Sequence, residues 1–137
     1  MARYNTEMFC RFVYNPELSY DDLLAFEASL KLGLTGILRD YGGEFIHFEE
    51  TGDAMRLQCV FAGHDEDLFH ALCDRIAPLT DGRVEAGILF VDKDLALLHI
   101  YSLHDSAWRE CCVRMPDPGP LTRAMADRDL GACRTLP

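Results

Sequence analysis

Apolar and polar residues alternate along the first strand-like stretch of this sequence, residues 7–14. Alternation with a period of two is typical of a β-strand that buries one face. Met8 and Phe12 point to one side of such a strand, whereas Phe9 and Arg11 point to the other. We therefore expect a strand here with one face in the core.

The hydrophobic period changes to three or four residues after Ser19. Asp22 follows three residues later, which resembles a capping box with Asp in place of Glu. Gly33 and Gly36 weaken the expected helix by about 1 kcal/mol each relative to Ala, and we interpret them as a bend or a close contact with a sheet. Gly42–Gly43 ends the helix. The apolar positions that predict it are Leu23, Phe26, Leu30, Leu34, Ile37, Leu38 and Tyr41.

The rest of the chain predicts a second helix and several more strands. Asp65, Glu66 and Asp67 suit a helix N-terminus, where acidic side chains interact favourably with the helix dipole. Pro78 ends this helix. Strands are expected at residues 44–50, 54–62, 83–91, 95–102 and 107–115.

The resulting order of elements, β-α-β-β-α-β-β-β, predicts an α+β fold. Residues 7–91 resemble the ferredoxin-like split βαβ arrangement (β-α-β-β-α-β), extended here by two further antiparallel strands. The resemblance is one of topology and implies no function, because this fold hosts many unrelated activities. We expect a single α+β domain over residues 1–115, and a Pro-rich linker and short C-terminal tail over residues 116–137 that folding does not require.

Both predicted helices cover the same face of the sheet, so that face forms the core. The strand residues expected there are Met8, Cys10, Phe12, Leu57, Cys59, Phe61, Val84, Ile88 and Phe90.

The second face of the predicted sheet is more apolar than a solvated antiparallel sheet should be. An exposed apolar patch of this size usually contacts something. The first strand is expected between the third and the fourth, so Phe9, Val60 and Leu89 should form one apolar strip. The candidate binding residues on this face are Phe9, Arg11, Val13, Phe45, His47, Arg56, Val60 and Leu89, with Val91 and Gln58 also on it.

The sequence leaves three possibilities for what covers the second face. The tail or the last hairpin of the same chain could cover it, a second copy could form a homodimer through it, or a protein partner or small ligand could bind there.

Four aspartates are the candidate ligands for a cation site. The third and fourth strands run the same way, so the loops after them lie at one end of the sheet, where carboxylates suit calcium or magnesium. Helix capping and turn formation already explain these aspartates. We therefore predict no metal, and name as candidates only Asp65, Asp67, Asp92 and Asp94.

No catalytic residues are predicted. Glu66 and His70 lie four residues apart on one helical face, a spacing that fits two metal ligands, an acid/base pair or a surface ion pair. The glycines match neither a phosphate-binding loop nor a dinucleotide-binding motif, so no cofactor is expected.

Six cysteines fall mostly on apolar strand or helix positions, so we predict buried, reduced thiols and a cytoplasmic protein. They are Cys10, Cys59, Cys73, Cys111, Cys112 and Cys133.

The net charge of the chain argues against two classes of binding partner. The 137 residues include 23 Asp and Glu against 13 Lys and Arg, a formal net charge of −10. That charge argues against direct binding to nucleic acid or to an anionic membrane. No apolar run approaches the roughly 18 residues of a membrane span, and the N-terminus lacks the pattern of a secretory signal.

The leading hypothesis from the sequence is a non-catalytic acidic interaction module that forms a homodimer through the second sheet face. One alternative is a small-ligand-binding protein or enzyme that uses this face as a pocket, with Arg11, His47 and Arg56 as polar anchors. Another is an acidic decoy that occupies the nucleic-acid-binding surface of a partner protein.

Overall fold

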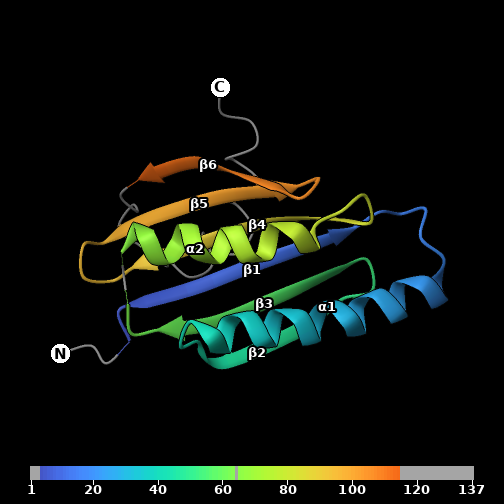
Figure 1. Ribbon diagram of the computed structural model, residues 1–137, viewed down its shortest axis with the longest axis horizontal. Helices are drawn as coiled ribbons and strands as arrows, with labels where there is room; N and C mark the ends of the chain where they lie inside the picture. Colours follow the sequence, from blue (N-terminus) through green and yellow to red (C-terminus); the bar gives the residue numbers. More distant parts are fainter. Residues whose placement is uncertain (1–3, 64, 115–137) are drawn as a thin grey trace.

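The computed structural model describes residues 4–63 and 65–114 (Figure 1). Its strands and helices occur in the predicted order. They are β1 (Thr6–Tyr14), α1 (Tyr20–Asp40), β2 (Glu44–Glu50), β3 (Ala54–Phe61), α2 (Glu66–Ile76), the 3₁₀ turn η1 (Ala77–Leu79), β4 (Val84–Asp92), β5 (Leu97–His104) and β6 (Ala107–Arg114). The predicted tail, residues 116–137, lies outside the described residues.

The strands form one antiparallel sheet with the order β2-β3-β1-β4-β5-β6, and both helices lie on one face of it (Figure 1). This arrangement confirms the α+β class and the position of β1 between β3 and β4. The sheet order is not that of a four-stranded ferredoxin-like sheet, because β5 and β6 extend it beyond β4.

The ends of α1 follow the sequence signals closely. The backbone N–H of Asp22 donates to the Ser19 hydroxyl at 3.2 Å, which satisfies one of the donors left free at a helix start. After α1, Gly42 adopts a left-handed φ of 82°, and the N–H of Gly43 donates to the Leu38 carbonyl at 2.7 Å. Gly36 has no atom within 4 Å of where a Cβ would lie, so no close contact with the sheet requires it.

Several strand boundaries differ by one residue from the sequence prediction, and the largest difference is at β5. The fifth strand begins at Leu97 instead of residue 95, because the preceding residues form a tight turn. In this turn the Asp92 carboxylate accepts from the N–H groups of Asp94 and Leu95 at 3.1 and 3.0 Å, and Ala96 has a positive φ of 53°.

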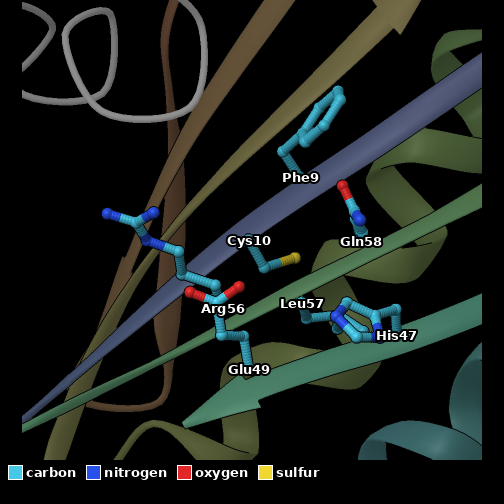
Figure 2. A pocket seen from close by; sticks show the side chains of 7 residues that line it. All are labelled: Phe9, Cys10, His47, Glu49, Arg56, Leu57 and Gln58. Atoms are coloured by element: carbon cyan, nitrogen blue, oxygen red, sulfur yellow. The ribbon is translucent and has the colours of Figure 1, made fainter. Parts of the chain in front are cut away.

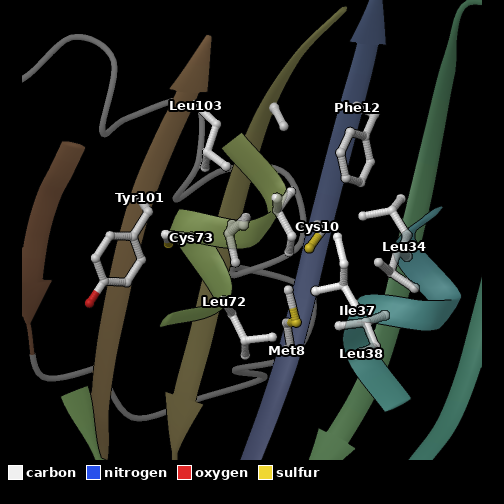
Figure 3. Close-up of a cluster of buried hydrophobic side chains, with 14 of the residues drawn as sticks. Met8, Cys10, Phe12, Leu34, Ile37, Leu38, Leu72, Cys73, Tyr101 and Leu103 are labelled. Carbon is white, nitrogen blue, oxygen red and sulfur yellow. The ribbon is translucent and has the colours of Figure 1, made fainter. Parts of the chain in front are cut away.

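The main core lies between the helices and the sheet (Figure 3). All nine strand residues predicted for it are buried there. Phe69 of α2 stacks on Phe90 of β4 with ring centroids 4.3 Å apart, and Leu34 and Leu38 of α1 are fully buried. Within the described ranges, neither helix combines the length and apolarity needed to cross a membrane.

Candidate binding face

The sheet face opposite the helices is organised by the strand register. Along one row, Glu49 of β2 lies opposite Arg56 of β3, Arg56 opposite Arg11 of β1, and Arg11 opposite Gly87 of β4. Cross-strand neighbours of this kind have Cβ atoms about 5 Å apart. The register therefore brings together Arg11 and Arg56, two of the predicted binding residues. It also places the Glu49 carboxylate beside Arg56.

The adjacent row runs from polar to apolar. His47 lies opposite Gln58, Gln58 opposite Phe9, Phe9 opposite Leu89, and Leu89 opposite Ile100. The polar residues come from β2 and β3, and the apolar ones from β1, β4 and β5. The face therefore divides into two halves, which differ in chemistry.

We call the first of these the apolar half: Leu89 and Val91 of β4 with Leu98 and Ile100 of β5. These side chains are only 0–4% exposed and form a hydrophobic cluster separate from the main core. Phe9 of β1 and Cys111 of β6 pack against this cluster and are partly buried.

We call the second the open half, on β1, β2 and β3. It comprises Phe9, Arg11, His47, Glu49, Arg56, Gln58 and Val60, together with Phe45 at the register shift in β2, which the sequence predicts on this face. Phe9, Arg11 and Val60 are partly buried, whereas the other five are exposed.

A hollow of about 150 Å³ lies on the open half. Figure 2 shows Phe9, Arg56 and Gln58 around it on β1 and β3, with His47 and Glu49 on β2. Pockets for drug-sized molecules and cofactors measure roughly 300–1,000 Å³. The hollow therefore suits a single side chain or a small anion.

Phe45 is the most unusual residue of the open half. Its backbone has a φ of 54°, a left-handed conformation that is a genuine outlier for a bulky residue, and its side chain is 75% exposed. The strand pairing is interrupted here by a register shift between Glu44 and His47. Apart from an edge-to-face contact with Tyr4, with ring centroids 5.6 Å apart, the described residues offer this ring little cover.

The predicted strip of Phe9, Val60 and Leu89 is only partly contiguous. Phe9 and Leu89 lie directly opposite one another, but Val60 lies opposite Glu7 and is therefore diagonal to Phe9. Leu89 is 0% exposed, so its side chain offers no accessible surface to a second molecule. Val13, the remaining candidate, lies two residues beyond Arg11 along β1 and is half-buried.

The first pair of predicted carboxylates lies at the start of α2. Asp65 accepts from the backbone N–H of Leu68 at 2.8 Å and is the N-cap of the helix. Asp67 lies in the first turn and is exposed. Asp65 therefore has the helix-capping role that the sequence suggested, whereas Asp67 lies in the first turn, where a negative charge suits the helix dipole.

The second pair lies in the turn after β4. Asp92 is 1% exposed and accepts from two backbone N–H groups of its own turn. Asp94 accepts from the side-chain amide of Asn5 at 2.6 Å. Among the described residues, no three His, Cys, Asp or Glu side chains are arranged to hold a metal ion.

The sequence did not reveal the contacts of His70. The structure places its Nε2 3.7 Å from a carboxylate oxygen of Glu110 on β6. The ring lies 5.0 Å from that of Trp108, whose indole N–H donates to Asp74 at 2.8 Å. These contacts hold α2 against β6, so His70 belongs to an interface between elements rather than to the second face.

Cys10, Cys59, Cys73 and Cys111 are free thiols, and the first three are buried. Burial raises the pKa of the Cys59 thiol to about 12, and it also raises the pKa values of Cys10 and Cys73. Buried thiols with raised pKa values are poor nucleophiles, so these three favour a structural role.

Comparison with known proteins gives no family for this chain: no family model matches it, and no curated protein matches it. The geometry of the second face is therefore the basis on which a function can be inferred.

Proposed function

We propose that this protein is a non-catalytic interaction module that associates with a second copy of itself through the open half of the sheet. We further infer that β1 to β4 with the two helices form a ferredoxin-like core, because the order β2-β3-β1-β4 and the β-α-β-β-α-β sequence fit that arrangement. In this interpretation β5 and β6 are additions to that core.

The observation that supports association most strongly is the conformation of Phe45. A residue held at an unfavourable φ costs on the order of 1–3 kcal/mol and usually persists for a functional reason. Phe45 is also 75% exposed, so its ring gains little from burial within the chain. A partner that covers this ring would supply the missing stabilisation, since full burial of a Phe side chain is worth roughly 1.5–3 kcal/mol.

The charges of the open half favour a second copy as the partner. Glu49 and Arg56 lie side by side in the register, so the face presents both signs of charge. A two-fold axis that passes between these residues would set Glu49 of each copy against Arg56 of the other. A self-complementary patch of this kind is what a symmetric dimer requires.

Light scattering after size-exclusion chromatography tests the proposal. We expect the wild type to be a dimer, and Phe45→Asn and Val60→Asp to be monomers. Asn tolerates positive φ better than Phe, so Phe45→Asn should fold at least as stably as the wild type. Leu32→Asp is the matched control, because Leu32 is 77% exposed on α1, away from this face.

A monomeric wild type would contradict self-association. A dimer that survives both face variants but dissociates with Leu32→Asp would place the interface on α1. A loss of stability in Phe45→Asn would show that the Phe45 ring serves the fold.

One observation favours a second candidate function, the binding of a small anion. Arg11 and Arg56 lie directly opposite one another, and an anion between two guanidinium groups would offset their repulsion. Isothermal titration with inorganic phosphate and with acetate tests this candidate. Phosphate binding that Arg11→Gln weakens at least tenfold would support it, and no binding at millimolar phosphate would contradict it.

A further inference from the structure

The burial of the apolar half requires a cover from the same chain. Leu89, Val91, Leu98 and Ile100 are 0–4% exposed in a single copy, with no partner chain present. On the same sheet face, Gln58 and His47 are exposed. An antiparallel sheet leaves such side chains accessible unless another layer lies over them.

The described elements do not supply this layer. Both helices lie on the opposite face of the sheet (Figure 1). The turn that joins β4 to β5 lies beyond the strand ends, and its Leu95 is 61% exposed, so this turn does not fold back over the cluster. Within the described ranges, the partly buried hydrophobic residues that pack against this cluster are Phe9 and Cys111, and both come from the sheet itself.

The path of the chain after β6 indicates which segment can cover the apolar half. β6 ends at Arg114, and Arg114 lies opposite Leu98, a member of the cluster. The chain therefore leaves the sheet beside the apolar half and continues for residues 115–137. Outside the described ranges the chain has otherwise only residues 1–3 and His64, which are too few to cover four large side chains.

We propose that the C-terminal segment, residues 115–137, docks on the apolar half of its own sheet. Leu121 and Met125 are two large apolar residues near the middle of this segment, which also contains Met115, Leu130 and Leu136. The segment would then be part of the folded domain, contrary to the sequence expectation of a separable tail. It would also confine a second copy to the open half, because the apolar half is already occupied.

Site-specific photo-cross-linking in the full chain tests this docking. Phe9 packs against the cluster and is only partly buried, so the photoreactive p-benzoylphenylalanine can replace it with little disturbance. Isotopically light and heavy chains are mixed before illumination, so that cross-links within one chain differ in mass from cross-links between chains. The same amino acid at Leu32 on α1 is the control.

We expect the probe at position 9 to join a peptide from residues 115–137 of the same chain, and the probe at position 32 to give no such product. Cross-links between light and heavy chains would show that a second copy covers the apolar half. The absence of any cross-link to residues 115–137 would equally overturn the proposal.

A pair of full-chain variants adds an independent measurement. Leu121→Ser with Met125→Ser should melt at least about 5 °C lower and bind a hydrophobic dye, because the apolar half becomes accessible. Arg123→Ser with Asp127→Ser changes the same segment at polar positions and should match the wild type. Equal melting and no dye binding in both variants would contradict the docking. Self-association is tested at Phe45 and Val60 instead, so the two proposals can fail separately.

Discussion

Arg11 of β1 and Arg56 of β3 lie directly opposite one another on the sheet, and Glu49 of β2 lies on the other side of Arg56. Arg56 therefore has one attractive and one repulsive cross-strand neighbour. Like charges that face each other across strands destabilise a sheet, whereas opposite charges contribute roughly 0.2–1 kcal/mol. The row thus places two like charges side by side, with one opposite charge beside Arg56.

This arrangement of charges predicts that two charge-reversal substitutions, Arg11→Glu and Arg56→Glu, change the free energy of unfolding differently. Arg11→Glu converts the row to alternating charges and should raise the free energy of unfolding by roughly 0.2–1 kcal/mol. Arg56→Glu leaves one attractive and one repulsive neighbour, so its stability should be unchanged or lower. Both variants change the net charge equally, and urea denaturation of monomeric samples compares them. Equal stability of the two would show that the register pair has no energetic effect.

The hydroxyl of Tyr14 donates to the carboxylate of Glu27 at 2.7 Å, and Glu27 is 8% exposed. Tyr14→Phe leaves this carboxylate without its donor, so we expect a loss of about 1–3 kcal/mol. The double variant Tyr14→Phe with Glu27→Leu should recover much of it, because neither polar group is then left unpaired. Thermal or urea unfolding measures both.

Tyr101→Phe is the matched control. Tyr101 is 0% exposed, and its hydroxyl makes no hydrogen bond with the described residues, so its removal should be neutral or stabilising. If both Tyr→Phe variants lost the same free energy, the hydrogen bond to Glu27 would not be the cause.

Two glycines should respond oppositely to alanine. Gly36 lies within α1 with open space around it, so Gly36→Ala should stabilise the protein by about 1 kcal/mol through helix propensity. A Cβ at Gly43 would lie 2.9 Å from the carbonyl oxygen of Leu38, and backbone cannot move aside cheaply. We expect Gly43→Ala to cost about 1–3 kcal/mol. Chemical denaturation that ranked the two variants the other way would contradict this account.

Alkaline conditions should destabilise the protein partly through Cys59. Burial raises the pKa of its thiol from 9.0 to about 12, so the folded chain keeps this proton after the unfolded chain has lost it. The associated stability is complete below about pH 9 and is lost as the pH rises toward 12, by about 1.4 kcal/mol per pH unit.

Cys59→Val tests this linkage, since it keeps an apolar side chain of similar size without a titrating proton. From pH 9 to pH 10.5, with reductant present, the wild type should lose about 1.6 kcal/mol more than Cys59→Val, since at pH 9 only half of the unfolded thiols have ionised. Parallel pH profiles for the two proteins would show that Cys59 does not contribute.

Local patterns in the sequence were enough to predict the helices, the strands and the main core. In β1, period-two alternation places Met8, Cys10 and Phe12 on one side, and the structure buries all three. Ser19 and Asp65 were recognisable as helix starts, because capping depends on residues only three positions apart. Local periodicity and local hydrogen bonding are properties of adjacent residues, so they can be read without knowledge of the fold.

The exposure of side chains on the second face could not be predicted from the sequence, because it depends on long-range contacts. Alternation places Phe9 and Leu89 on the same face, but it does not show that Leu89 is fully buried while Phe45 is exposed. It also does not give the opposition of Arg11 and Arg56, or the approach of His70 to Glu110. These relationships depend on strand register and on which segment lies over which strand, and both are set by contacts between residues far apart in the chain.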